Sequence, residues 1–436
     1  MLSIKNIRFT DPRKWPFFYG WVIMVMTTLG LFVSIPGQTM AVSAFTDSLI
    51  DALNISRNQL STTYMIGTIT SAFLLKRAGL WYDRYGAKVV MFLATLTMSF
   101  AMLGMANLVP LSNVFAENLF HLFSAKTWSM ILLSLFFFLA RLNGQGIMSM
   151  VARNMLMKWF FRKRGFANGI SSMVANALFA MATVILAYFV SKYQWDVTYC
   201  ILAVILFVAS ILFLGTYEDN PESFGLLPDG KKYETQSVKK EKSTGRDFTY
   251  NQAIRTRAFW SVTLITAFFG CFVTGFTFHI FSIFRDANIP WERGQDVFIY
   301  SAILSTLLSF GGSVISDHIK TKYLVLLAAV GGLMCGIGLA FVSNPMFFII
   351  LIVGYGTIGG LFGVLLTVAH PGYFGKKHLG AITGRNMSLI IFGSAVSPLL
   401  FSLSKTYFDS YLPVSLIFAS LALLIFLFTL TVKEPQ

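Results

Sequence analysis

Long apolar runs separated by short polar stretches make up most of the chain. The runs continue for about 20 residues or more without the strict alternation of a half-buried β-strand. Because a bilayer leaves only helices or closed barrels as spanning structures, runs of this kind predict membrane-spanning helices. We expect twelve of them, at about residues 17–44, 58–77, 88–109, 128–152, 166–190, 197–216, 258–284, 295–316, 323–343, 346–369, 381–404 and 411–432.

Composition supports this prediction and changes the meaning of the net charge. Of the 436 residues, 56% are apolar and only 12% are charged, about half the charged share of an ordinary soluble domain. The formal charge of +15 could suggest nucleic acid, but the basic residues lie between the apolar runs and do not cluster on one folded face. The sequence therefore predicts the lipid bilayer as a partner and no nucleic acid.

Nothing in the sequence indicates a metal or a cofactor. Cys200, Cys271 and Cys335 lie inside apolar runs, without the spacing of a disulfide framework or a zinc site. No GxxxxGK[ST] loop for a nucleotide phosphate occurs. We therefore predict no cofactor and no metal, and neither an enzyme nor an ATP-driven pump.

Lys and Arg predict the orientation. Leaving out Arg141, Arg153 and Arg385, 25 of the Lys and Arg residues lie in loops or at span ends on one side and six on the other. Since cytoplasmic loops carry the excess of basic residues, both termini are predicted to be cytoplasmic, in the inner (plasma) membrane. We expect a monomer.

One long polar stretch divides the chain. Residues 217–257 carry eight Lys and Arg, with a turn signal at Asn220-Pro221. They are predicted to be a cytoplasmic linker between six-helix bundles at residues 1–216 and 258–436. The predicted fold class is an all-α membrane protein of two six-helix pseudo-repeats.

Two sequence similarities relate the two halves of the chain. The segment 160–167 resembles 373–380, at an offset of 213 residues, and Asp83 has a counterpart in Asp317, at an offset of 234 residues. The difference of 21 is about the length of an extra loop at residues 110–127. Transporters are often built from such repeats, with the substrate site at their interface.

A segment rich in glycine and charge follows the second predicted span, and it reads GLWYDRYGAK from Gly79 to Lys88. It resembles the loop between the second and third helices of the major facilitator superfamily, a resemblance that covers essentially the whole chain. The resemblance implies a gate in which Asp83 caps or pairs with a facing helix. A tight turn whose charges only set topology is the simpler alternative. The gating candidates are Gly79, Asp83, Arg84, Gly86, Lys88 and, in a second copy without the flanking glycine and arginine, Asp317.

Three further segments narrow the resemblance. They are Tyr19-Gly20-Trp21, residues 159–169 with the sequence WFFRKRGFANG, and residues 373–384. These are similar to segments of monocarboxylate porters and their oxalate/formate antiporter relatives. The resemblance implies secondary active transport of a small organic anion.

Charges inside the spans are the strongest independent signal, because an ionisable group within a membrane is costly and marks function by default. Arg141 lies near the middle of the fourth span, and Gln145 and Ser149 follow it at helical spacing. Such a stripe can face a water-filled cavity and bind an anion. Alternatively, Arg141 is structural and bonds carbonyls of a neighbouring broken helix, for which the Pro36-Gly37 break in the first span is a candidate.

His279 and Arg385 are the other ionisable candidates. His279 lies in the seventh span, where a pKa near neutrality would suit proton coupling, although a lone histidine is more often a packing residue. Arg385 is shallower and able to snorkel. Neutral substrate-binding candidates, chosen by depth, are Gln38, Tyr64, Gln145, Asn176, Tyr300 and Tyr355.

These observations predict a secondary active transporter of a small organic anion, a mono- or dicarboxylate. Cations without carboxylates inside the spans favour an anion, because a buried charge is tolerable only when paired. Protons or a counter-anion would be the coupled species. Efflux of an amphipathic anion such as a siderophore or drug, or a non-transporting receptor, are the alternatives.

Overall fold

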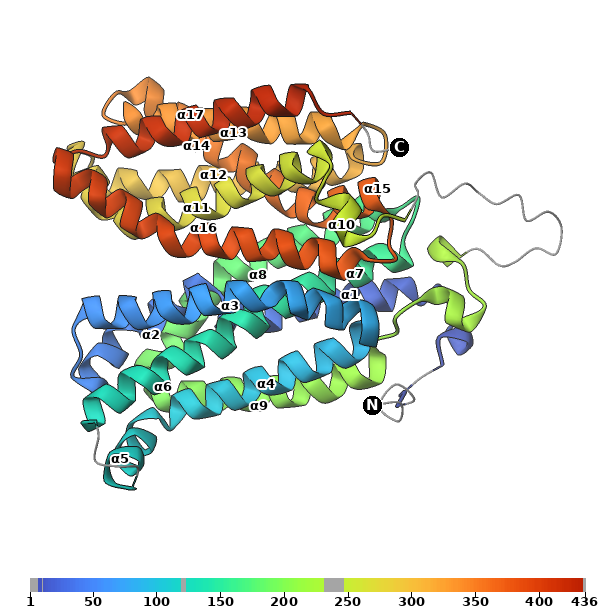
Figure 1. Ribbon diagram of the computed structural model, residues 1–436, viewed down its shortest axis with the longest axis horizontal. Coiled ribbons are helices and arrows are strands. Elements are labelled where there is room, and N and C mark those ends of the chain that lie inside the picture. Colours follow the sequence, from blue (N-terminus) through green and yellow to red (C-terminus); the bar gives the residue numbers. More distant parts are fainter. Residues whose placement is uncertain (1–6, 10, 119–122, 231–246, 434–436) are drawn as a thin grey trace. The chain divides into compact units, whose positions relative to one another are not determined.

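The computed structural model describes residues 7–9, 11–118, 123–230 and 247–433, and every regular element within them is a helix (Figure 1). Contacts divide the chain into two compact units. Unit 1 comprises Met1–Met155 and Val174–Lys232, and unit 2 comprises Leu156–Met173 and Tyr233–Gln436. The bundle limits predicted at residues 216 and 258 concern membrane topology and stay a prediction.

The helices follow one another in two sets of six spans. Those of the first half are α1 (Gly20–Val33), η3 (Ile35–Gly37), α2 (Thr39–Leu53), α3 (Arg57–Tyr85), α4 (Ala87–Ala106), α5 (Leu108–Asn118), α6 (Ala125–Ala140), η4 (Arg141–Met148), α7 (Ser149–Trp159), α8 (Arg164–Tyr193) and α9 (Trp195–Thr216). Those of the second are α10 (Tyr250–Ala253), α11 (Arg257–Asp286), α12 (Trp291–Ile315), α13 (Thr321–Ala340), α14 (Pro345–Val364), η7 (Leu365–Ala369), α15 (His370–Phe374), α16 (Leu379–Phe408) and α17 (Leu412–Leu430).

Three spans are interrupted helices. The pairs α1 and α2, α6 and α7, and α14 and α15 each form one span, joined by η3, η4 and η7. With α5 and α10 set aside as short additions, the count is the predicted twelve. Nine helices of the described residues are long and apolar enough to cross a membrane, and α1 is a shorter apolar helix. The predicted all-α, twelve-helix architecture is confirmed.

The end of the second span differs from the prediction. Residues 79–88 were expected to form a loop, but α3 continues to Tyr85 and only Gly86 leaves the helix, with a φ of +87°. No proline or left-handed residue precedes Gly86, so nothing ends the helix earlier. Asp83 and Arg84 therefore lie on the last turn of a helix and not in a turn between helices.

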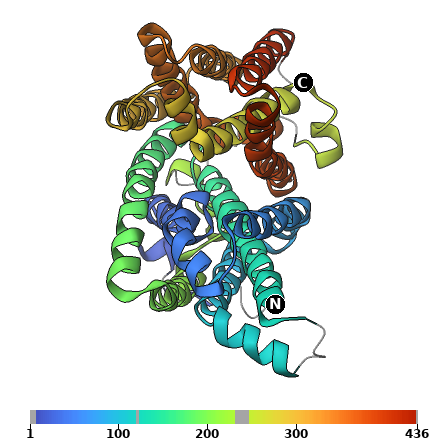
Figure 2. The same cartoon turned by 90° about the vertical axis from the view of Figure 1, so that its left-hand side faces the viewer.

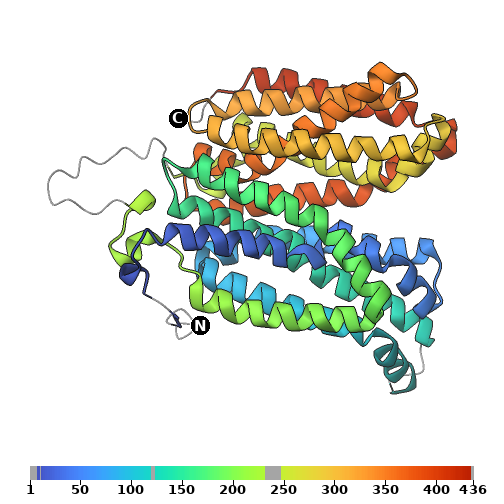
Figure 3. The same ribbon diagram turned by 180° about the vertical axis from the view of Figure 1, so that it is seen from behind.

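Within each unit the helices pack in pairs. The helices α4 and α9 lie side by side in unit 1, and α11 and α16 do so in unit 2 (Figures 1 and 3). In unit 2, α13 packs against both α14 and α17, as the end-on view in Figure 2 helps to follow. A Cβ at Gly338 would lie 2.6 Å from the backbone nitrogen of Leu351, so glycine sets the close approach of α13 to α14.

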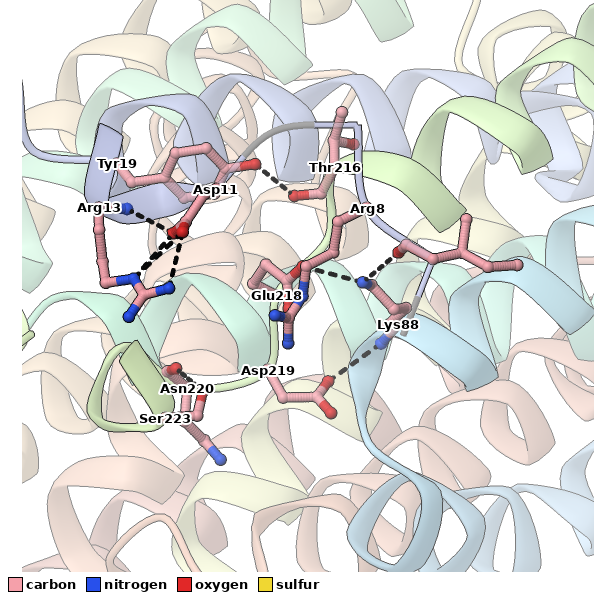
Figure 4. Close-up of polar contacts among 11 residues, drawn as sticks. Arg8, Asp11, Arg13, Tyr19, Lys88, Thr216, Glu218, Asp219, Asn220 and Ser223 are labelled. Atoms are coloured by element: carbon pink, nitrogen blue, oxygen red, sulfur yellow. Dashed lines mark hydrogen bonds and ion pairs between the residues drawn. The ribbon is translucent and has the colours of Figure 1, made fainter. Parts of the chain in front are cut away.

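A polar network ties three segments together at one end of unit 1 (Figure 4). The Lys88 ammonium, at the start of α4, donates to Glu218 Oε1 at 2.9 Å and to the carbonyl of Ile7 at 2.9 Å. Arg8 Nε lies 3.1 Å from the same Glu218 oxygen, and the backbone N–H of Lys88 donates to Asp219 Oδ1 at 3.0 Å. The N-terminal segment and the root of the linker are thereby fixed to the start of α4.

Burial makes the Lys88–Glu218 pair the decisive part of this network. The side chain of Lys88 is 2% exposed and that of Glu218 is 7% exposed, whereas that of Arg8 is 43% exposed. Burial raises the pKa of the Glu218 carboxyl, and the ammonium of Lys88 opposes that shift. Lys88, a gating candidate from sequence, is thus held inside unit 1.

Glu218→Gln should destabilise the protein more than any change at Arg8. Removing one member of a buried ion pair leaves a buried charge without compensation, which costs about 3 kcal/mol. Arg8→Gln, the control, breaks only an exposed pair and should cost under about 1 kcal/mol. Chemical denaturation of the two purified variants measures the difference. Equal losses of stability would contradict this account of the network.

Candidate substrate site and gating contacts

Arg141 is buried at the start of a π-helical segment. It begins η4, in which the helix of the fourth span widens for residues Arg141–Met148 before α7 continues it. The residue is only 1% exposed. π segments inside α-helices are frequent at functional sites, because they turn a side chain out of the regular register.

The broken first span supplies the acceptors for Arg141. Pro36 lies in η3, the short 3-10 segment that separates α1 from α2. Gly37, the last residue of η3, accepts a hydrogen bond at its carbonyl from Arg141 Nη1 at 3.2 Å. The same Nη1 donates to Thr39 Oγ1 at 3.1 Å, and the Tyr64 ring centroid lies 5.3 Å from the guanidinium carbon. The sequence left two roles open for Arg141, anion binding and a structural bond to the broken first span, and this contact is the structural one.

Two glycines allow that contact. A Cβ at Gly144 would lie 2.8 Å from both the Gly37 Cα and the Ser34 carbonyl oxygen, so η3 and η4 touch backbone to backbone. No larger residue fits at Gly144 without moving the carbonyl that Arg141 binds.

The guanidinium keeps one edge without a protein partner. Neither Nε nor Nη2 of Arg141 has a hydrogen-bond acceptor among the described residues. These two N–H groups point in parallel and form the edge that binds a carboxylate in bidentate fashion. Arg13 shows this geometry in the same chain: its Nε and Nη2 hold the carboxylate of Asp11 at 3.1 and 2.8 Å.

Polar side chains from three spans of unit 1 lie on the segments next to Arg141. Gln38 Nε2 donates to Ser149 Oγ at 3.3 Å, and the hydroxyl of Tyr64 donates to Thr39 at 3.0 Å. Gln145 lies in the same π segment as Arg141, and its Oε1 is buried with no partner in the described part of the chain. The structure therefore brings together Arg141, Gln38 and Tyr64, with a further unpaired acceptor on Gln145.

The other neutral candidates do not share that environment. Tyr355 packs in unit 2 among phenylalanine rings, such as Phe276 at 5.7 Å between centroids. Tyr300 is 56% exposed on α12, next to a groove of about 360 Å³ that Asp296 also lines. Asn176 is half-buried in α8. Nothing in the contacts of these three singles them out as substrate ligands.

His279 is bonded through both ring nitrogens. Its Nε2 lies 3.0 Å from the carbonyl oxygen of Pro398 and its Nδ1 lies 3.4 Å from the hydroxyl of Tyr411. The ring also stacks on Phe401, with 10° between the planes. This is the arrangement of a packing histidine between α11, α16 and α17, and a role in proton coupling stays a prediction.

Arg385 is the second arginine without a fixed partner. It is half-buried on α16, and no described residue forms a hydrogen bond or ion pair with it. The neighbouring Asn386 is buried, accepts from Thr266 at 3.0 Å and leaves its Nδ2 unpaired within the described chain. Unit 2 therefore also offers donors that an anion could use.

Sequence reasoning missed His370. It begins α15, is fully buried, and neither ring nitrogen has a hydrogen-bond partner among the described residues. His370 directly follows the tenth predicted span, 346–369, so the length of the apolar run alone did not place it inside the membrane. The dipeptide His370-Pro371 was the available signal.

Asp317 bonds the start of α8 inside unit 2, and its gating role stays a prediction. Both of its carboxylate oxygens accept from the backbone N–H of Gly165, at 3.0 and 3.1 Å, at the start of α8. Asn168 Nδ2 adds a bond of 2.9 Å to Ser313 Oγ. A carboxylate at a helix N-terminus complements the helix dipole. The second copy of the motif thus makes this contact although it lacks the flanking glycine and arginine.

Comparisons with known proteins agree with this architecture. The family model described as Major Facilitator Superfamily matches residues 27–398. The chain belongs to the Major Facilitator Superfamily. It is accordingly a multi-pass membrane transporter and not an enzyme, and the family supports secondary transport by alternating access.

Solved structures of the superfamily share the fold at low identity. The proton:xylose symporter XylE, bound to 6-bromo-6-deoxy-D-glucose, is 15% identical with a TM-score of 0.66, covering 95% of this chain and 96% of that one. The E. coli fucose:proton symporter FucP is 14% identical with a TM-score of 0.61, covering 96% and 99%. No curated protein matches the chain significantly.

Gly144→Ala should destabilise this superfamily member at the η3–η4 contact. The added methyl group must displace the backbone of Gly37 or Ser34, and overpacking of this kind costs about 1–3 kcal/mol. Gly311→Ala is the matched control, because a Cβ there would meet no atom within 4 Å. Thermal unfolding in detergent should show a lower Tm for Gly144→Ala alone. A Tm equal to that of the control would refute the close contact.

Asp317→Asn should loosen the start of α8. The amide keeps an acceptor but loses the charge, which is worth about 0.3–1 kcal/mol at a helix N-terminus. Hydrogen exchange of residues 165–168 should quicken. Asp286→Asn, which removes a carboxylate 2.7 Å from Lys405, should leave those amides unchanged.

Acidification should weaken the contact of Asp317 with the start of α8, as Asp317→Asn does. Burial raises the pKa of Asp317, against the opposing effect of the Gly165 N–H and Arg164, so its carboxyl is protonated at a higher pH than an ordinary aspartate. The contact should therefore weaken as the pH falls through that raised pKa. Corrected for intrinsic exchange, protection that does not change with pH would contradict the charge–dipole account.

Proposed function

We propose that this transporter moves a small organic anion, a mono- or dicarboxylate, by alternating access with proton symport or anion exchange. The observation that carries the proposal is the buried Nε–Nη2 edge of Arg141, which has no partner in the described chain. Burial of a guanidinium is costly unless an anion pairs with it, so the edge is suited to a carboxylate. The excess of basic residues favours a plasma-membrane protein with cytoplasmic termini.

The anchored half of the guanidinium supports this role. Because Nη1 is fixed by Gly37 and Thr39, the free edge is held in one orientation before substrate arrives. Preorganised donors lose little freedom on binding. Gln38, Gln145 and Tyr64 are polar groups of the same unit that can orient the rest of a small acid.

A neutral sugar is the contrasting substrate. XylE and FucP are described as proton symporters for xylose and fucose. A sugar would leave the charge of Arg141 unpaired, which argues against it here. Uptake into proteoliposomes should therefore occur for members of a panel of labelled lactate, pyruvate, oxalate and succinate and not for xylose or fucose. Sugar uptake alone, or export of an anionic dye alone, would overturn the proposal; binding without any flux would point to a receptor.

Arg141→Lys should sharply reduce uptake of whichever acid the wild type carries. Lysine keeps the charge but offers a single point of contact in place of a planar fork, so we expect at least about a tenfold weaker apparent affinity, or about 1.4 kcal/mol. Arg13→Lys is the matched control, because it alters the same kind of fork where Arg13 is exposed, 64% by side chain. Uptake by Arg141→Lys equal to that of the control would remove Arg141 from the substrate site.

A further inference from the structure

His370 is a fully buried imidazole with unmet hydrogen-bonding capacity. Its exposed fraction is 0%, and both Nδ1 and Nε2 lack a partner among the described residues. A neutral imidazole always carries one N–H donor and one acceptor nitrogen. Leaving such groups buried and unpaired is unfavourable, so native proteins keep few of them. The structure holds His370 in an unfavourable state that another conformation can relieve.

The contrast with His279 is informative. His279 has an acceptor for one ring nitrogen, the Pro398 carbonyl, and a hydroxyl beside the other, that of Tyr411. Its bonds would have to break before it could change protonation state freely. Nothing comparable holds His370.

The backbone around His370 is loosened on both sides. The π segment η7 (Leu365–Ala369) ends directly before it, and Pro371 follows it. Proline has no N–H to donate, so the helix loses one backbone bond at this point. A π segment next to a proline can change register at lower cost than a regular α-helix. His370 therefore lies where its span can move.

The surroundings of the ring favour the neutral form in this state. The imidazole stacks on Phe259, with 5.8 Å between centroids and 24° between planes, and Phe374 lies 6.2 Å away. The elements packed on α15 are η7, α11 and α16.

Among the residues that the structure describes, no carboxylate accepts a bond from the ring. The titratable groups at this end of the packed elements are Arg257, His378, Arg385 and, within α15, Tyr373. Arg164 lies near Gly372, and Asp247 accepts from the backbone of Lys376. In this state an imidazolium would be buried with no carboxylate of the described residues bonded to it, which disfavours the charged form.

We propose that His370 is the site that binds and releases the coupled proton. In the state seen here the ring is buried among protein groups. In one open state, water from one side of the membrane reaches the ring, and the lone pair of one nitrogen binds a proton delivered as hydronium, so that imidazolium and water form. In the opposite open state, the imidazolium releases that proton to water on the other side, and the neutral ring is buried again. This inference rests on the proposed transport function and adds the residue that couples it to pH.

The first test separates proton movement from anion movement. Wild type, His370→Gln, His370→Phe and, as a control at an exposed histidine, His318→Gln are reconstituted into liposomes loaded with the pH dye pyranine and given an inward gradient of labelled pyruvate. Wild type and His318→Gln should acidify the lumen as pyruvate enters. Both His370 variants should lose acidification and gradient-driven uptake but keep exchange of labelled for unlabelled pyruvate. Phenylalanine fills the aromatic site, so it controls for misfolding in the glutamine variant.

Acidification by both His370 variants at the wild-type rate would overturn the proposal. Pyruvate movement without acidification in the wild type would also do so, because no proton would then be coupled. No pyruvate movement at all in the wild type would count against the proposed function instead.

A second measurement needs no substrate. Mass spectrometry of hydrogen exchange at the histidine ring C2 reports protonation of each histidine separately. His370 in the wild type should titrate with slow, opening-limited exchange, whereas a ring that stays neutral and protected from about pH 5 to 8 would overturn the proposal.

Discussion

Burial of the Arg141 guanidinium is the constraint on which the first unit depends. A charged group at membrane depth must find acceptors within the protein, because lipid offers none. Among the described residues, the carbonyl of Gly37 and the hydroxyl of Thr39 supply them, where the first span breaks at η3. The break, the glycine at position 144 and the π segment together allow this contact. Nη1 is thereby bonded, and Nε and Nη2, which have no partner in the described chain, form the edge that we propose for the substrate.

The polar side chains between the helices of unit 2 form weaker contacts than Arg141 does in unit 1. The helices of unit 2 are joined by glycine contacts and by single hydrogen bonds between small polar side chains, such as Thr274 with Ser394 at 2.8 Å. Its ionisable groups inside the spans include His279, His370 and the half-buried Arg385. His279 is hydrogen-bonded, whereas His370 has no partner among the described residues. The two proposals together assign binding of the substrate anion to unit 1 and binding of the coupled proton to unit 2.

Much of the fold could be predicted from the sequence because apolar length is a direct consequence of bilayer thickness. The interruption of the first span was visible in Pro36-Gly37, and a contact of this break with Arg141 was one of the two alternatives that the sequence left open. Helix ends were less predictable: charged residues such as Asp83 suggested a loop, yet α3 continues beyond the apolar run to Tyr85. The partner of Lys88 could not be foreseen, since Glu218 is 130 residues away. Which nitrogen atoms stay unpaired depends on packing and not on spacing.

The central claim is that a carboxylate pairs with the free edge of Arg141. Thermal stability of the purified protein with pyruvate and with pyruvamide, its neutral amide of similar shape, tests it most directly. The account predicts that the acid at 100 times its Kd stabilises the fold by about 2.7 kcal/mol and that the amide has no effect at the same concentration. Equal stabilisation by both compounds would contradict the account, because shape and not charge would then determine binding.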